Sequence, residues 1–311
     1  MKPVVAASLI VSVAISLIIT AFAWPAKNIA PRDVPIGVAG PAPFVEQVQH
    51  KLPPGAFVVT SYPDRDAATA AIKDREIYGA VVAGNPPTVL TAPAGSVVVA
   101  QVLDGLAAGL SGQPTTHSTP VVSLPADDPR GSGFGAGALP MVLGGLLAGV
   151  VCFFLVGSAA LRGAALVAAA VLSGFAGAAL LGPWLGILPG GYLATAGVMM
   201  LGFLAIGATV TGLAALIGPP GIGIAAIVVM LVGNPFSGAT SAPEMLPSGW
   251  GELGQWLPPG AVTSLLRSVS YFDGAAAAHP LWILLGWIAF GVVLLGVSSR
   301  RPASSAPPGS H

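Results

Sequence analysis

The chain is a series of long apolar runs separated by polar, glycine-rich or proline-rich stretches. These runs cover residues 1–24, 137–157, 163–185, 191–217, 219–233 and 280–299. A helix needs about 20 apolar residues to cross roughly 30 Å of hydrocarbon, and beyond Lys2 no charge falls inside a run. The pattern predicts a polytopic α-helical membrane protein with six transmembrane helices. The run at 219–233 is the shortest, and its boundaries are the least defined.

The first run has a second interpretation as a cleaved signal peptide. Ala21, Phe22 and Ala23 form the small-x-small pattern that a signal peptidase reads. The apolar stretch before them is about 18 to 20 residues, longer than the roughly 7 to 15 of a signal peptide. Its length favours an uncleaved membrane anchor over residues 1–24.

Composition places the protein in lipid and narrows the function classes. Hydrophobic residues make up 54% of the 311 positions, charged residues only 8%, and the mean hydropathy is +0.83. Soluble domains average about 25% charged residues, so the expected partner is the lipid bilayer. Twelve basic and twelve acidic residues cancel, which leaves no basic field for nucleic acid. The single cysteine, Cys152, lies in an apolar run and is expected to be a small hydrophobe.

Charges predict the orientation of the chain. Lys2, Arg162, Arg300 and Arg301 flank the apolar runs, whereas all twelve acids fall within 33–128 and 244–273. Short basic segments stay in the cytoplasm, which predicts cytoplasmic N and C termini with a disordered tail at 300–311. Abundant Ala, Gly and Pro suggest a bacterial plasma membrane.

Residues 25–136 have the texture of an extracytoplasmic α/β domain inserted between the first two membrane helices. Apolar and β-branched runs predict strands, and amphipathic stretches between them predict helices. The expected strands cover 34–39, 57–61, 77–83, 88–91 and 120–124, and a third helix covers 95–111. Alternating strands and helices indicate a small α/β sandwich with some parallel pairing. The borders at 25–35 and 131–137 are rich in Pro or Gly, as in flexible joints.

Candidate chemistry is sparse in this segment, and no enzyme, metal or cofactor is predicted. His50 and His117 lack ligand partners at metal-binding spacing, and no hydrolase, zinc or phosphate-loop motif occurs. Asp64 is expected to cap a helix. Asp127 and Asp128 are expected to be solvated in a linker.

Small residues within the apolar runs are candidates for helix packing, because they let helix backbones approach in lipid. They are Gly145, Gly149, Ser173, Gly177, Gly207 and Gly212. No ionisable group lies inside a run, which disfavours a proton- or sodium-driven transporter.

The loop at 234–279 is the expected functional segment. Prolines at 258 and 259 predict the start of a short helix with apolar positions at helical spacing, lying in the interface or dipping inward. Trp250, Trp256 and Tyr271 are expected to anchor it at headgroup depth. Arg267 is predicted to pair with Glu252 or Glu244, or alternatively to reach lipid phosphates.

The architecture resembles the membrane subunits of type-2 ABC exporters and the related phage-infection-protein group. The resemblance is concentrated in DRDAATAAIKDREIYGAVV at 64–82 and in GNPFSGATSAPEMLPSGWGELGQWLPPGAVTSLLRSVSYFDG at 233–274. It implies six-helix subunits that form a homodimer, a path at the dimer interface, and an outer gate between the last two spans. The corresponding gate residues here are Asn234, Pro235, Phe236, Ser237, Gly238, Glu244, Glu252, Pro258, Pro259, Gly260 and Arg267.

Such exporters receive work from a separate ATPase through cytoplasmic helices. Here only Met1 and Lys2 precede the apolar residues of the first run, which begin at Pro3, and the connection at 158–162 is about five residues. The resemblance makes a transport-related permease subunit the expected function. Because these connections are short, a separate ATPase is only a possible partner. The alternative is a non-transporting cell-envelope or secretion-associated protein whose external domain binds a partner.

Overall fold

Among the residues that the computed structural model describes, five helices are long and apolar enough to cross a membrane. They are α1 (Lys2–Lys27), α5 (Ser132–Leu155), α6 (Ala159–Ala179) with its π-helical extension η1 (Leu180–Trp184), α7 (Tyr192–Ile217) and α11 (Ala278–Ser299). The structure describes residues 2–111 and 118–300, so the expectations for His117 and for the tail beyond Arg300 fall outside it. The prediction of a polytopic helical membrane protein is confirmed.

The sixth expected span, at 219–233, forms a shorter element. Seven residues of α8 (Pro220–Ala226) are followed by seven of the π-helix η2 (Ile227–Gly233). At about 1.5 Å per residue this element is roughly 21 Å long, less than the thickness of the hydrocarbon. A sixth crossing therefore stays a prediction.

The start of α5 corrects two expectations. Asp128 is buried, and its carboxylate accepts hydrogen bonds from the backbone N–H of Gly133 at 3.0 Å and of Phe134 at 3.4 Å. It satisfies donors that a helix N-terminus leaves without partners, so it is not a solvated linker residue. Residues 132–137 are accordingly the first turns of α5 rather than a flexible joint.

The first border is also ordered. Helix α1 continues to Lys27, and the chain after it bonds to a distant segment. The N–H of Ala30 donates to the Met245 carbonyl, and that of Arg32 donates to the Glu244 carbonyl, each at 3.0 Å. Long-range backbone pairing of this kind fixes the path between α1 and the sheet.

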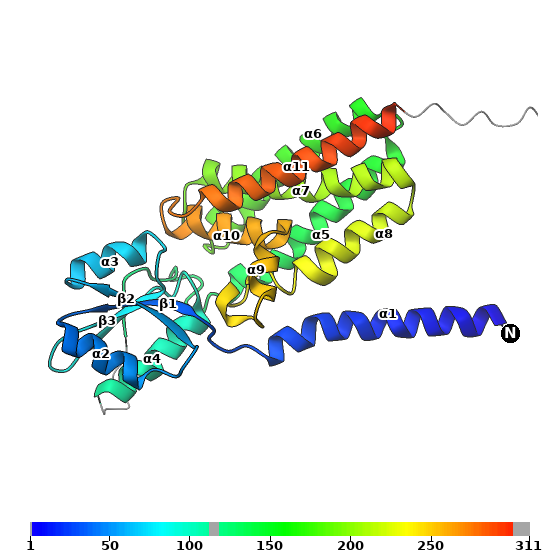
Figure 1. The fold of residues 1–311 in the computed structure, drawn as a ribbon. Helices are drawn as coiled ribbons and strands as arrows, with labels where there is room; N and C mark the ends of the chain where they lie inside the picture. The colour runs from blue at the N-terminus through cyan, green and yellow to red at the C-terminus, as the bar shows by residue number, and fades with distance from the viewer. Residues whose placement is uncertain (1, 112–117, 301–311) are drawn as a thin grey trace, which may run out of the picture.

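Helix α7 is the centre of the bundle, packed against α5, α6 and α11 (Figure 1). An added Cβ at Gly145 or Gly149 of α5 would come within 2.8 Å of Ile206 or 2.6 Å of Val210. Thr211 donates to the Gly149 carbonyl at 3.0 Å across the same interface. Close backbone approach therefore seats α5 on α7.

The remaining packing candidates lie where α7 meets α6 and α11. A Cβ at Gly177 would approach Met199 at 2.3 Å, one at Gly207 would approach Leu166 at 3.0 Å, and one at Gly212 would approach the Gly291 carbonyl at 2.7 Å. Ser173 is half-buried; the adjacent Gly174 makes the closer approach, with its Cβ position 2.4 Å from Met200.

The α/β domain contains a five-stranded sheet in the order β2-β1-β3-β4-β5. The strands are β1 (Val34–Ala39), β2 (Phe57–Tyr62), β3 (Gly79–Val82), β4 (Thr88–Thr91) and β5 (Thr119–Pro120). Strand β1 pairs in parallel with β2 and β3, β4 is antiparallel to β3, and β5 is parallel to β4. The strand predicted at 120–124 is wrong in position, because the chain bends after Pro120 toward α5.

Helices cover both faces of this sheet, which makes three layers. Val34, Ile36 and Val38 share one core with side chains of α2 (Ala42–Lys51) and α4 (Val97–Ser111). Ala80 and Leu90 face the opposite core, under α3 (Arg65–Lys73). Asp64 accepts from the Ala67 N–H at 2.8 Å, which confirms the predicted cap of α3. The alternation follows from the period of two along a strand.

Helix α1 stands apart from the other helices (Figure 1). None of its apolar window is buried within the chain, and Leu9, Ile10 and Ile19 are each at least 60% exposed. Its contacts concentrate at the C-terminal end, where Trp24 meets Trp250 edge-on at 6.0 Å. An apolar surface of this extent fits association with the lipid bilayer.

Candidate functional site

The segment 234–279 folds into three short helices at the end of the bundle that adjoins the sheet (Figure 1). They are η3 (Pro243–Met245), α9 (Trp250–Gln255) and α10 (Pro258–Tyr271). Pro258 and Pro259 occupy the first positions of α10, where a missing N–H costs no helical hydrogen bond. The predicted helix start is confirmed.

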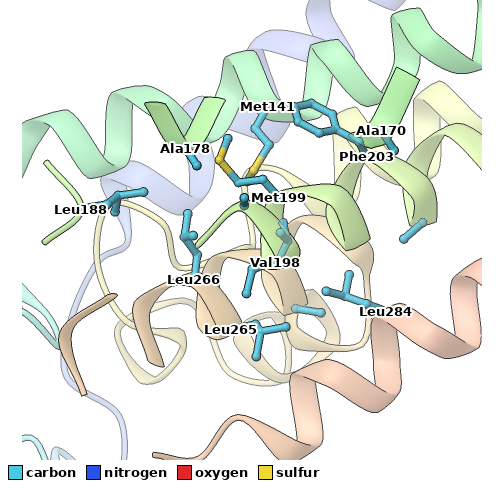
Figure 2. Close-up of a cluster of buried hydrophobic side chains, with 14 of the residues drawn as sticks. Met141, Ala170, Ala178, Leu188, Val198, Met199, Phe203, Leu265, Leu266 and Leu284 are labelled. Atoms are coloured by element: carbon cyan, nitrogen blue, oxygen red, sulfur yellow. The ribbon is translucent and has the colours of Figure 1, made fainter. Parts of the chain in front are cut away.

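Helix α10 is largely buried in protein. Leu265 and Leu266 pack with Val198 and Met199 of α7 in the main hydrophobic core of the bundle (Figure 2). Val262 lies against Gly202, whose added Cβ would approach it within 2.6 Å. The helix thus closes the end of the bundle by apolar burial.

Glycines allow close packing within residues 234–279, which we call the closure. An added Cβ at Gly254 would lie 1.8 Å from the Phe236 carbonyl oxygen, and one at Gly260 would lie 2.1 Å from the Gly254 carbonyl oxygen. An added Cβ at Gly233, the last residue of η2, would lie 2.9 Å from the ring of Pro259. Backbone therefore packs directly on backbone between Phe236, α9 and the start of α10.

The expected gate residues 234–238 form a turn inside this closure. Asn234 and Pro235 are half-buried, and the other three are buried. Ser237 donates to the Asn234 carbonyl at 2.8 Å. Phe236 stacks on Trp250 with ring centroids 4.5 Å apart, and Trp24 meets Phe236 edge-on at 6.3 Å. The aromatic cluster connects α1 to the closure.

The other expected interfacial anchors differ in their surroundings. Trp256 is 60% exposed, as an interfacial tryptophan would be. Tyr271 is instead enclosed by protein, since its hydroxyl donates to the Ile187 carbonyl at 2.7 Å and its ring lies 6.0 Å from that of Phe134. Tyr271 fixes α10 to the segment before α7.

Arg267 is the most unusual group of the closure. It is only 5% exposed, and its Nη2 donates to the carbonyls of Ala239 at 3.2 Å and Gly238 at 3.5 Å. Its guanidinium carbon lies 4.7 Å from the centroid of the Phe134 ring. Burial, with repulsion from nearby Arg75, lowers the pKa of Arg267 to about 10.

The predicted contact of Arg267 with Glu252 or Glu244 is replaced by these carbonyl and aromatic contacts. Glu252 is exposed on α9. Glu244 accepts a hydrogen bond from the Tyr78 hydroxyl at 2.9 Å, and burial together with Glu244 raises the pKa of Tyr78. The alternative of reaching lipid phosphates stays a prediction, although the Arg267 side chain does not extend to the protein surface.

Arg75 joins the sheet to the closure, a role that no sequence motif indicated. It follows α3, donates to the Ser264 carbonyl at 3.0 Å and to the Ser268 hydroxyl, and lies 5.3 Å over the Phe272 ring. Burial lowers its pKa. Phe272 itself belongs to the core under α3, so the domain and α10 share one hydrophobic core.

Arg32 makes a second connection. Its guanidinium donates to the carbonyls of Met245 at 3.1 Å and Leu246 at 2.9 Å, and also to those of Asn28 and Ala30. Met245 is buried in the other core of the sheet domain. Sheet, closure and bundle therefore form one connected body.

A cavity of about 720 Å³ lies between the sheet domain, the closure and the start of α11. Its charged lining mixes both signs and consists of Arg32, Asp33, Arg75, Glu76, Glu244 and Glu252, with His279 at the α11 side. No group of three or more His, Cys, Asp or Glu within 2–111 and 118–300 is arranged to hold a metal ion. The cavity offers polar binding contacts.

Taken together, the fold defines a polytopic helical membrane protein that carries a three-layered α/β domain on one end of its bundle. Comparison with protein families, with curated proteins and with solved structures gives no significant match. The likeness to type-2 ABC exporters thus remains an expectation from the sequence.

Proposed function

We propose that this chain is a transport-related permease subunit of a bacterial plasma membrane, with residues 234–271 as its outer gate. The observation that supports this most is the enclosure of α10 between the sheet domain and α7. A short helix that closes the end of a bundle and is covered by a folded domain is suited to control access to that end. A homodimer with a separate ATPase would complete the proposed exporter.

The proposed orientation places the sheet domain outside the cell. The N-terminal end of α1 and the end of α11 both lie on the side of the molecule remote from the sheet (Figure 1). Lys2 and Arg300 are at these ends, and Arg162 lies at the α5–α6 connection, as cytoplasmic basic residues would. Arg162 also donates to the carbonyls of Val156 at 2.7 Å and Phe153 at 3.0 Å.

Cysteine labelling tests this orientation. In a Cys152→Ala background, we expect a membrane-impermeant maleimide to label Ala70→Cys on intact cells, because Ala70 is exposed on α3. Gly157→Cys, in the exposed α5–α6 connection, should react only after the membrane is permeabilised. The reverse pattern would refute cytoplasmic termini and the outer gate together.

The second candidate is a non-transporting envelope protein whose external domain binds a partner. It is favoured by the short connections remote from the sheet, which leave little surface for an ATPase. Three residues, 156–158, join α5 to α6, and two residues, 218 and 219, join α7 to α8. Coupling helices of type-2 exporters are expected in such connections.

A reversible disulfide between α5 and the closure distinguishes the exporter from the non-transporting envelope protein. The Cβ position of Gly135 on α5 lies 3.1 Å from Thr240 Cγ2 and 3.8 Å from its Cα, a separation suited to a disulfide. If the gate moves during transport, oxidised Gly135→Cys/Thr240→Cys protein, purified from native membranes with its ATPase, should hydrolyse ATP at least about fivefold more slowly. Reductant should restore the rate.

The two single-cysteine variants, treated with the same oxidant, are the controls and should hydrolyse ATP at the wild-type rate. Recovery of the protein without a stoichiometric ATP-hydrolysing subunit would contradict the exporter proposal and favour the envelope role.

A further inference from the structure

A second cavity, of about 320 Å³, lies where the first turns of α5 meet α4 and residues 239–241. Its polar lining includes Arg130, Arg267, Ser96, Gln101, Ser132 and Thr240. No Asp or Glu of the described chain contributes to the lining. The cavity therefore presents two positive charges together with several neutral hydrogen-bonding groups.

The buried Arg267 side chain is the observation that points to a ligand. Only its Nη2 is hydrogen-bonded, to the two carbonyls already described, and its Nε and Nη1 make no hydrogen bond to any residue in 2–111 or 118–300. The acids nearby are already engaged. Asp128 accepts from the α5 backbone, and Glu244 accepts from Tyr78. A guanidinium this deeply buried ordinarily has an anion as its partner.

Part of the cavity wall is apolar and adjoins the start of a helix that could span a membrane. Val97, Val98, Leu124 and Phe134 contribute to this wall. Phe134 belongs to the first turn of α5, which is long and apolar enough to span the membrane. A ligand with a phosphate group and an adjoining apolar part would match the charged and the apolar parts of the wall.

We propose that this cavity binds a phosphate oxyanion between Arg267 and Arg130, carried by a phospholipid headgroup or by a soluble phosphate. Guanidinium groups bind phosphate oxygens through paired N–H donors. Arg130 is exposed at the mouth, and Arg267 lies at the buried side. This site is separate from the cavity of about 720 Å³ described above. The proposed binding does not require the chain to be a transporter.

Binding to the full-length protein in detergent tests the proposal. We would delipidate wild type, Arg130→Gln and Arg267→Lys, then add phosphatidylglycerol, phosphate-free diacylglycerol or inorganic phosphate. Lipid retention is counted by native mass spectrometry, and melting temperature reports stabilisation by bound ligand. Arg65→Gln is the control, since Arg65 is an exposed arginine on α3.

Wild type and Arg65→Gln should bind a phosphate ligand at least about tenfold more tightly than Arg130→Gln. Arg267→Lys keeps the charge without the paired donors and should also bind more weakly. Retention of phosphatidylglycerol without stabilisation by inorganic phosphate would assign a phospholipid site. Stabilisation by inorganic phosphate without lipid retention would assign a soluble oxyanion. Equal binding by all four proteins, or equal retention of diacylglycerol, would overturn the proposal.

Discussion

Gly254→Ala is expected to destabilise the protein by about 3 kcal/mol or more, the largest effect of a single methyl group in this chain. The added Cβ would lie 1.8 Å from the oxygen and 2.5 Å from the carbon of the Phe236 carbonyl. Backbone atoms cannot rotate away as a flexible side chain can. Relief requires α9 to separate from the 234–238 turn, which would disturb the stacking of Phe236 on Trp250.

Thermal unfolding of the purified protein in detergent, followed by far-UV circular dichroism, measures this effect. Gly223→Ala is the matched control, because Gly223 also lies in a helix but an added Cβ there meets nothing within 4 Å. That change should be neutral or stabilise by about 0.5 to 1 kcal/mol. A Gly254→Ala protein that melts with the wild type would show that the closure is not packed backbone on backbone.

Gly291→Ala is expected to destabilise the bundle by about 2 kcal/mol, because α7 and α11 cross with their backbones in contact. The new Cβ would lie 2.4 Å from the carbonyl carbon of Ala208 and 2.6 Å from its oxygen. From the other side, a Cβ at Gly212 would lie 2.7 Å from the Gly291 carbonyl. Neither helix can accept a methyl group without moving away from the other.

Gly296→Ala, five residues further along α11, is the control for this interface. An added Cβ at Gly296 meets nothing within 4 Å, so its melting temperature should stay at or above that of the wild type. Equal destabilisation by both changes would mean that loss of helix flexibility, rather than contact with α7, decides the stability of α11.

Much of the α/β domain could be predicted from local patterns. Strands at 34–39 and 88–91 have the predicted bounds, and Asp64 caps α3 as expected. Both features depend on neighbours a few residues away, through the period of two in a strand and the first-turn donors of a helix. The order of the strands in the sheet and the sharing of Phe272 with the closure depend on distant contacts.

The closure shows where sequence reasoning reached its limit. Prolines at 258 and 259 indicated the start of α10, but its apolar spacing fitted an interfacial helix as well as a buried one. The partners of Arg267 were assigned by charge, whereas the fold supplies the Ala239 carbonyl and the Phe134 ring. Arg75 was not singled out, because its contacts lie 189 and 193 residues away.

By itself, the sequence determined that this is a helical membrane protein with an α/β insertion, because hydropathy and short periodicities act within one segment. Tertiary structure alone decided that α10 is enclosed, that Arg32 and Arg75 tie the domain to the 234–279 segment, and that Arg267 lies at a cavity lined by no acid of the described residues. These arrangements depend on which surfaces meet after folding. Direct contact of backbones at Gly254 and Gly291 leaves no periodic signal in the chain, since any of its 42 glycines could in principle provide it.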